Sequence, residues 1–143
     1  MIVYLDTSAV VPLIVAEAGS DFCRRLWDEG DAVTTCRLTY VETAAALAQG
    51  ERMGRLKAKA HRDALRLLDR LWVEFEVIEV DDALVRRAAG LAAEFGFRGY
   101  DAVHCASAAE LRDDDLVSAS GDRKLLGAWR ALGLATADTN AGE

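Results

Sequence analysis

Four carboxylates stand where helices are expected to begin, and three of them follow a short apolar run or its turn. They are Asp6, Glu42, Asp101 and Asp122. In an open, mostly parallel α/β sheet, ligands bind outside the carboxyl ends of the strands. Acids from distant parts of a chain can meet there, so we expect these four to share one pocket.

Such a cluster of acids predicts a particular chemistry. Like charges at close range raise one another's pKa, and a divalent cation is the usual means of stabilising them. Carboxylate oxygens are hard ligands that suit Mg²⁺, with Mn²⁺ as an alternative. The four acids therefore indicate metal-dependent chemistry on a phosphate group.

Each acid also has a structural interpretation, because acidic side chains stabilise helix N-termini. In the segment TYVE, Thr39 and Glu42 match a capping box with Thr39 as the N-cap. Asp122 can cap the helix that follows it, and Asp101 can be a first-turn acid. Taken singly, capping is the simpler explanation. Taken together, the four acids favour a metal site.

Asp6 and Asp101 favour the metal interpretation most. Asp6 ends an apolar strand at a point where Thr7 or Ser8 could equally serve as the N-cap. Asp101 has apolar neighbours on a helix that is expected to be buried. A buried aspartate needs a partner or a metal.

The elements that would position these acids alternate along the chain. Strands are predicted at residues 1–6, 32–35, 73–80, 116–120 and 134–136. Helices are predicted at residues 7–15, 20–30, 39–54, 55–72, 83–96, 100–112 and 122–133. Because no repeat, linker or low-complexity stretch interrupts them, we expect one three-layer α/β domain over residues 1–143. Residues from about 136 to 143 are expected to form a frayed tail.

Composition excludes several classes of protein. The longest apolar runs are too short to span a bilayer, and no signal peptide is evident, so a cytoplasmic protein is expected. An odd count of three cysteines indicates reduced thiols rather than a disulfide framework. His61 and His104 lack the spacing of a zinc motif.

One stretch departs from the overall acidity of the chain. The net charge is −7, which gives no general attraction for nucleic acid. Between residues 51 and 70, however, seven basic residues stand against three acidic ones. The stretch is either a solvated helix face with salt-bridge partners or a surface that steers a polyanion. The candidates for RNA contact are Arg55, Lys59, Arg62 and Arg66, which recur at helical spacing.

Four segments, in order, also resemble a known family. They are YLDTSAVVPLI, TYVETAAAL, RGYDAVHCASA and SASGDRKLL. The chain resembles the PIN-domain nucleases and, more narrowly, the VapC toxins of prokaryotic toxin–antitoxin operons. The similarity extends from Ile2 to about Leu134, and the ordered set of four acids makes it specific.

The resemblance implies a PIN-like α/β/α domain with a mainly parallel sheet and a Mg²⁺- or Mn²⁺-dependent endoribonuclease activity. It assigns the four acids to the catalytic metal site, with Thr7 and Ser8 as nearby hydroxyls. It also implies a structured RNA substrate such as tRNA or rRNA. The expected partners are a second copy of the chain and a cognate antitoxin, in a heterotetramer or larger complex, without a membrane.

Three alternatives remain at this point. A PIN nuclease of RNA processing would share the site but have no antitoxin. A Mg²⁺-binding phosphotransfer or signalling domain would need paired acids near the first strand, whereas Asp6 is followed by Thr7 and Ser8. A non-catalytic interaction module would not need the acids at all.

Overall fold

The computed structural model describes residues 1–141, which form five strands and seven helices. The strands are β1 (Ile2–Leu5), β2 (Ala32–Cys36), β3 (Glu76–Ile78), β4 (Leu116–Ser120) and β5 (Ala135–Asp138). The helices are α1 (Thr7–Ile14), α2 (Ser20–Glu29), α3 (Leu38–Arg52), α4 (Ala58–Trp72), α5 (Asp82–Phe95), α6 (Gly99–Glu110) and α7 (Arg123–Ala131).

The strands form one parallel sheet in the order β3-β2-β1-β4-β5. The central strand β1 has Tyr4 in register with Thr34 of β2 and Ser118 of β4. Parallel strands that are covered on both faces are continuously apolar, which explains the sequence IVYL of β1. All five carboxyl ends lie along one side of the sheet, called the carboxyl edge below.

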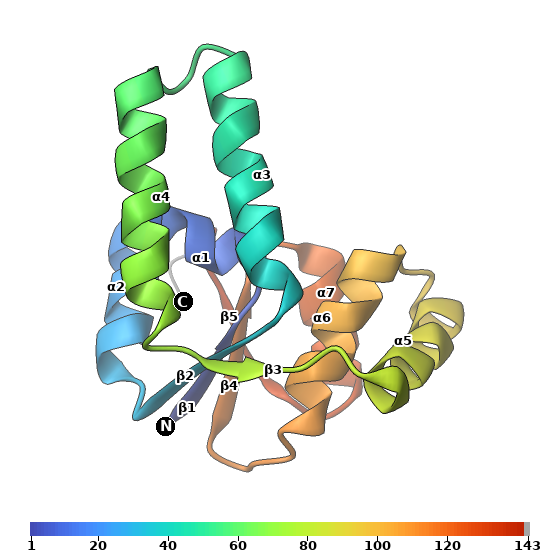
Figure 1. The fold of residues 1–143 in the computed structure, drawn as a ribbon. Helices are drawn as coiled ribbons and strands as arrows, with labels where there is room; N and C mark the ends of the chain where they lie inside the picture. The colour runs from blue at the N-terminus through green and yellow to red at the C-terminus, as the bar shows by residue number, and fades with distance from the viewer. Residues whose placement is uncertain (142–143) are drawn as a thin grey trace.

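Helices cover both faces of the sheet (Figure 1). Alternate residues of β1 point to opposite faces. Val3 and Leu5 pack with Val10 of α1 and Leu26 of α2. Tyr4 packs in a second core formed by α5, α6 and α7. The predicted three-layer α/β/α architecture is therefore confirmed.

Helices α3 and α4 form a hairpin that extends well beyond the sheet (Figure 1). The turn between them contains Gly54 at φ +76°, a conformation that glycine adopts without steric cost. The carbonyl of Gly50 accepts the backbone N–H groups of Arg55 and Leu56, which holds the turn. The tip of the hairpin therefore projects beyond the sheet layer into solvent (Figure 1).

The C-terminal segment differs from the sequence-based expectation. Residues 135–138 form the edge strand β5, and Thr139 is buried with its N–H bonded to the Ser120 carbonyl. The predicted frayed tail is therefore wrong for residues 136–139, because pairing with β4 satisfies their backbone groups. Residues 142–143 lie outside the part of the chain that the structure describes.

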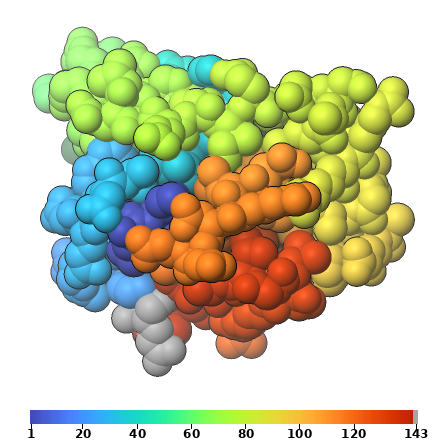
Figure 2. Space-filling model, turned by 90° about the horizontal axis from the view of Figure 1, so that it is seen from below, coloured from blue at the N-terminus to red at the C-terminus, as the bar shows by residue number. Residues whose placement is uncertain are grey.

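At the opposite edge of the sheet, where the strands begin, ion pairs connect the chain start to two loops. The Met1 ammonium group pairs with Asp31 and with Asp115, the latter at 3.0 Å. Figure 2 looks onto this side and shows the first residues between the segments around residues 20–30 and 110–116. Across residues 1–141, every helix is too short or too polar to cross a bilayer.

Candidate active site at the carboxyl edge

Asp6 directly follows the central strand and is the N-cap of α1. Its carboxylate is 6% exposed and accepts three hydrogen bonds: from the Ser8 and Ser120 hydroxyls, each at 2.6 Å, and from the Ala9 N–H at 3.1 Å. The expectation that Thr7 or Ser8 caps this helix is wrong, because the Asp6 carboxylate reaches the free N–H of Ala9. The pKa of Asp6 is raised by burial, although the charge of His104 and these three hydrogen bonds act in the opposite direction.

Asp122 is joined to Asp6 through one serine. The Ser120 hydroxyl donates to Asp6 and accepts the Asp122 N–H at 2.9 Å. The Asp122 carboxylate caps α7 by accepting the N–H groups of Lys124 and Leu125. The capping interpretation of Asp122 is therefore confirmed, and the loop that carries this acid is tied to the loop that carries Asp6.

Glu42 does not form the predicted capping box. Helix α3 begins at Leu38, so Thr39 lies inside the helix, where its hydroxyl contacts that of Thr35 at 2.6 Å. The Glu42 side chain turns toward the sheet instead. Its Oε1 atom accepts the Thr7 hydroxyl at 2.8 Å and contacts His104 Nε2 at 2.7 Å. The capping interpretation of Glu42 is therefore wrong.

The surroundings of Glu42 favour its ionised form. Burial raises the pKa of Glu42, but the hydrogen bond from His104, the charge of His104 and the bond from Thr7 outweigh it, so the pKa is lowered. Glu42 is therefore a carboxylate at neutral pH, with Oε1 engaged by its neighbours.

Asp101 lies in the first turn of α6 and is partly buried. Its pKa is raised by burial and by the negative charges of Asp122 and Glu42, while His104 and Lys124 act in the opposite direction. Asp122 and Glu42 therefore lie close enough to Asp101 for their charges to act on its carboxyl group. Asp101 is thus a negative group that its surroundings do not neutralise.

His104 is a member of this site that the sequence motifs did not indicate, since it belongs to no zinc motif. The side chain is 3% exposed and lies one turn after Asp101 on α6. Besides Glu42 it contacts the Tyr4 hydroxyl, at 2.8 Å from Nδ1. The spacing of Asp101 and His104, three residues apart on one helix, was the available signal that both face the same side.

The two auxiliary hydroxyls hold acids in place. Thr7 donates to Glu42, and Ser8 donates to Asp6 while accepting the Gly121 N–H at 2.8 Å. Beside them lies a hollow of about 460 Å³, whose wall includes Thr7, Ser8, Asp122 and Asn140. A ligand in this hollow would lie next to Asp122 and the two hydroxyls.

The donor set fits a hard divalent cation that retains part of its water. Within residues 1–141, no three side chains of His, Cys, Asp or Glu lie close enough to form a ready-made metal cage. Mg²⁺ is usually bound through one or two carboxylates, several waters and the substrate phosphates, and does not need such a cage. The four acids supply only oxygen donors, and burial together with the charges of Asp122 and Glu42 raises the pKa of Asp101.

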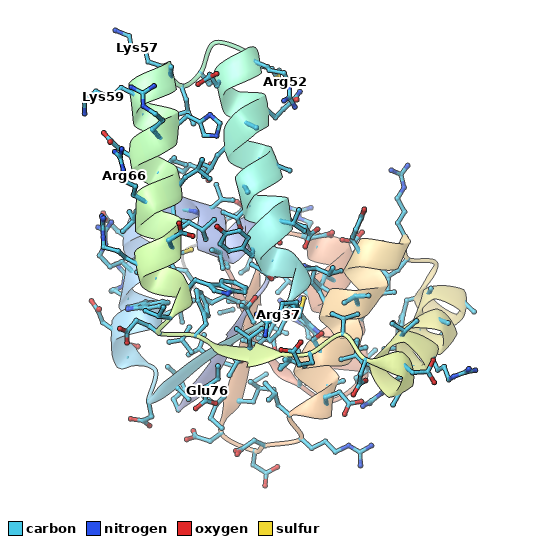
Figure 3. All side chains as sticks on the ribbon, in the orientation of Figure 1. Arg37, Arg52, Lys57, Lys59, Arg66 and Glu76 are labelled. Atoms are coloured by element: carbon cyan, nitrogen blue, oxygen red, sulfur yellow. The ribbon has the colours of Figure 1, made fainter. Side chains whose placement is uncertain are left out.

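The basic candidates lie away from these acids, on the hairpin. Lys59, Arg62 and Arg66 are exposed on α4, and Lys59 and Arg66 both pair with Asp63, at 2.8 and 3.1 Å. Arg55 precedes α4 and lies in the turn, so the expected single helix face is wrong for Arg55. Figure 3 shows Lys59 near the tip of the hairpin and Arg66 lower on the outer side of α4.

Comparison with known proteins identifies related chains. Residues 3–126 match the family model described as PIN domain. Ribonuclease VapC49 of Mycobacterium tuberculosis (strain ATCC 25618 / H37Rv) is 40% identical over 124 residues, which are 87% of this chain and 86% of the relative.

Solved structures share the fold. M. tuberculosis VapC20, described as a toxin that cleaves the sarcin-ricin loop, has a TM-score of 0.66 and 21% identity over 88% of this chain and 94% of that one. A chain of a toxin–antitoxin complex from Klebsiella pneumoniae has a TM-score of 0.61 and 14% identity, with 84% and 86% covered.

Proposed function

The chain belongs to the PIN-domain family as a VapC-type ribonuclease toxin, and on this premise we propose that it hydrolyses RNA phosphodiester bonds at the carboxyl edge with a divalent cation. The observation that carries the proposal is that acids from separate helices meet at the carboxyl edge, where the negative charges of Asp122 and Glu42 raise the pKa of Asp101. Like charges are costly to hold together unless a cation joins them. Mg²⁺ is the preferred cofactor, and Mn²⁺ is expected to replace it.

We assign the metal to Asp6 and Asp101, with Glu42 and Asp122 in direct contact or through water. When bound, the cation would polarise the scissile phosphate and lower the pKa of a water molecule. Ser8 and Ser120 hold Asp6 in one orientation, since each donates to a different carboxylate oxygen. Thr7 and His104 do the same for Glu42. Fixed carboxylates avoid reorganisation during the reaction.

The arrangement favours water over the ribose 2′-hydroxyl as the nucleophile. A 2′-hydroxyl mechanism commonly needs two acid–base groups, yet His104 is buried beneath Glu42 and His61 lies beside Glu51 on the hairpin. Asp122 or Glu42 is the proposed general base toward the attacking water. The products are then expected to carry a 5′-phosphate and a 3′-hydroxyl.

The direct test is cleavage of total RNA with Mg²⁺, with Mn²⁺ or with a chelator. We expect cleavage at few sites with either cation and none with the chelator. Sequencing of the cut ends reports both the position and the end chemistry. Ends with a 2′,3′-cyclic phosphate, or cleavage that persists in chelator, would overturn the mechanism.

The substrate and partners follow from the related proteins. Because VapC20 is described as cleaving the sarcin-ricin loop, we propose a structured RNA such as rRNA or tRNA in the cytoplasm. The toxin–antitoxin complex with the same fold supports a cognate antitoxin that blocks the site. We further propose that the chain acts as a homodimer, forming a heterotetramer or larger complex with the antitoxin. A neighbouring small gene for a DNA-binding protein would separate this function from antitoxin-free RNA processing.

Glu42→Gln tests whether the carboxylate charge serves the reaction. Gln keeps an oxygen that can accept from Thr7 and His104, so the fold should be retained. Loss of the charge is expected to lower kcat by about 10- to 100-fold, as for groups that support a metal site. It should also reduce the thermal stabilisation by Mg²⁺. The matched control is Glu94→Gln on the exposed side of α5. A fully active Glu42→Gln enzyme would limit Glu42 to a structural role.

The double variant Arg62→Ala, Arg66→Ala tests the hairpin as the RNA-binding surface. Each phosphate contact contributes about 0.7 to 0.9 to the slope of log K against log salt concentration. The slope is therefore expected to fall by about 1.4 to 1.8, with weaker binding at low salt.

The control for this variant is Arg24→Ala, Arg86→Ala. Those two arginines are also exposed on helices and paired with a neighbouring aspartate, as Arg66 is. Equal slopes for both double variants and the parent would show that the RNA binds elsewhere.

A further inference from the structure

We propose that His104 is a positioning residue of the nuclease site, which holds the Glu42 carboxylate so that one oxygen faces the fold and the other remains available to the site. The inference rests on the proposed function and adds to it a residue that does not itself touch substrate or metal. Its basis is the set of contacts that joins α6, α3 and β1 beneath the carboxyl edge.

The contacts of His104 leave its ring little freedom. Nε2 lies 2.7 Å from Oε1 of Glu42, and Nδ1 lies 2.8 Å from the Tyr4 hydroxyl. A carboxylate can only accept hydrogen bonds, so Nε2 carries the hydrogen in this contact. Tyr4 is fully buried in the central strand and packs edge-on against Trp129. The orientation of the imidazole is therefore set by the sheet itself.

Both neighbours of Glu42 bind the same oxygen. Thr7 donates to Oε1 from the start of α1, and His104 contacts Oε1 from α6. Two contacts from different elements define the rotation of the carboxylate and direct Oε2 away from them. In metal sites, groups that orient a ligand in this way typically change metal affinity or activity by about 10- to 100-fold when they are replaced.

A purely structural role of His104 predicts different effects of substitution. Replacement of a buried, hydrogen-bonded side chain lowers stability wherever it occurs, without a specific effect on metal binding. Two substitutions separate the roles, because each keeps one half of the imidazole. His104→Gln can place its amide near the position of Nε2 and still donate to Glu42. His104→Asn is shorter and can reach only toward Tyr4.

The experiment measures three quantities for the parent and both variants: the melting temperature, the Mn²⁺ dissociation constant by calorimetry without RNA, and kcat. We expect His104→Asn to weaken Mn²⁺ binding and to lower kcat by about 10- to 100-fold. His104→Gln should retain most of both. Leu91→Ala, in the core on α5, is the control for lost stability and should leave the Mn²⁺ constant unchanged.

A double-mutant cycle identifies the route of the effect. In a Glu42→Gln background, His104→Asn should change the Mn²⁺ constant by less than about twofold, because the group it orients is already uncharged. An equal loss in both backgrounds, or an unchanged constant for His104→Asn in the parent, would overturn the proposal. If His104→Asn does not fold, Tyr4→Phe replaces it in the cycle, and an unchanged Mn²⁺ constant there would overturn the proposal as well.

The controls also separate this inference from the function on which it rests. A parent protein that cleaves RNA and binds Mn²⁺, with variants that behave like it, refutes only the role of His104. A parent that neither cleaves RNA nor binds Mn²⁺ refutes the proposed function, and the role of His104 falls with it.

Discussion

Asp6→Asn is expected to lower RNA cleavage by at least about a hundredfold and to leave the fold intact. A bound metal ion contributes several kcal/mol to transition-state stabilisation, and each 1.4 kcal/mol corresponds to about a tenfold change in rate, so loss of a carboxylate that holds the ion should be costly. Asn remains a good N-cap, so α1 should keep its first turn. Burial raises the pKa of Asp6, so removal of the buried charge by Asn offsets the altered bond to Ser120.

The measurement pairs cleavage rates with thermal melts. Asp81→Asn is the matched control, since Asp81 is also an N-cap whose side chain accepts an N–H three residues on, in this case that of Leu84. The control should keep full activity. If Asp6→Asn kept activity as well, the assignment of the metal to the end of β1 would be wrong.

Asp101→Asn is expected to reduce cleavage by a similar factor and to raise the melting temperature when no divalent cation is present. Burial and the charges of Asp122 and Glu42 raise the pKa of Asp101 above its ordinary value of 3.8. This carboxyl therefore favours the folded state when protonated, below pH 3.8, and that contribution is lost as pH rises through the higher folded pKa. At neutral pH the ionised acid opposes folding, and Asn removes the opposition.

The gain in melting temperature should be largest at neutral pH and should disappear as the pH falls toward 3.8. In a domain of this size, a change of 1 kcal/mol in the free energy of unfolding shifts the melting temperature by roughly 2–6 °C. Added Mg²⁺ should stabilise the parent more than the variant. Asp114→Asn, in the exposed loop before β4, is the control and should show neither effect. If Asp101→Asn were less stable than the parent at every pH, the proposed repulsion of Asp101 by Asp122 and Glu42 would be wrong.

The sequence was sufficient to predict the fold and the placement of Asp6 and Asp122. Asp6 directly follows β1 and Asp122 follows β4 after one glycine, and the direction of a parallel sheet brings such positions to one edge. Glu42 was harder to interpret, because TYVE is a valid capping box if Thr39 is the N-cap of the helix. The N-cap lies two residues earlier, at Arg37, and the Thr39 hydroxyl contacts that of Thr35 of β2. That contact is tertiary, so local sequence rules do not report it.

Two further features depend on contacts between distant parts of the chain. His104 and Tyr4 are 100 residues apart, and a lone histidine on a helix of small residues has no local signal for such a contact. The last strand was predicted only as far as residue 136; the sequence ATAD of β5 has little β propensity, and pairing with β4 extends the strand to Asp138. In both cases the environment, rather than the residue type, determines the structure.

The separation of Asp6 and Ser120 along the chain also affects when activity can arise during synthesis. Their hydrogen bond joins residues 114 positions apart, and β1 cannot pair with β4 until residue 120 has been made. At about 5–20 residues per second, translation needs roughly 6–23 s to pass from Asp6 to Ser120. A ribosome-bound chain that ends before β4 therefore contains Asp6 and Glu42 but no assembled site. Prematurely terminated chains should be harmless to the RNA of the ribosome that makes them.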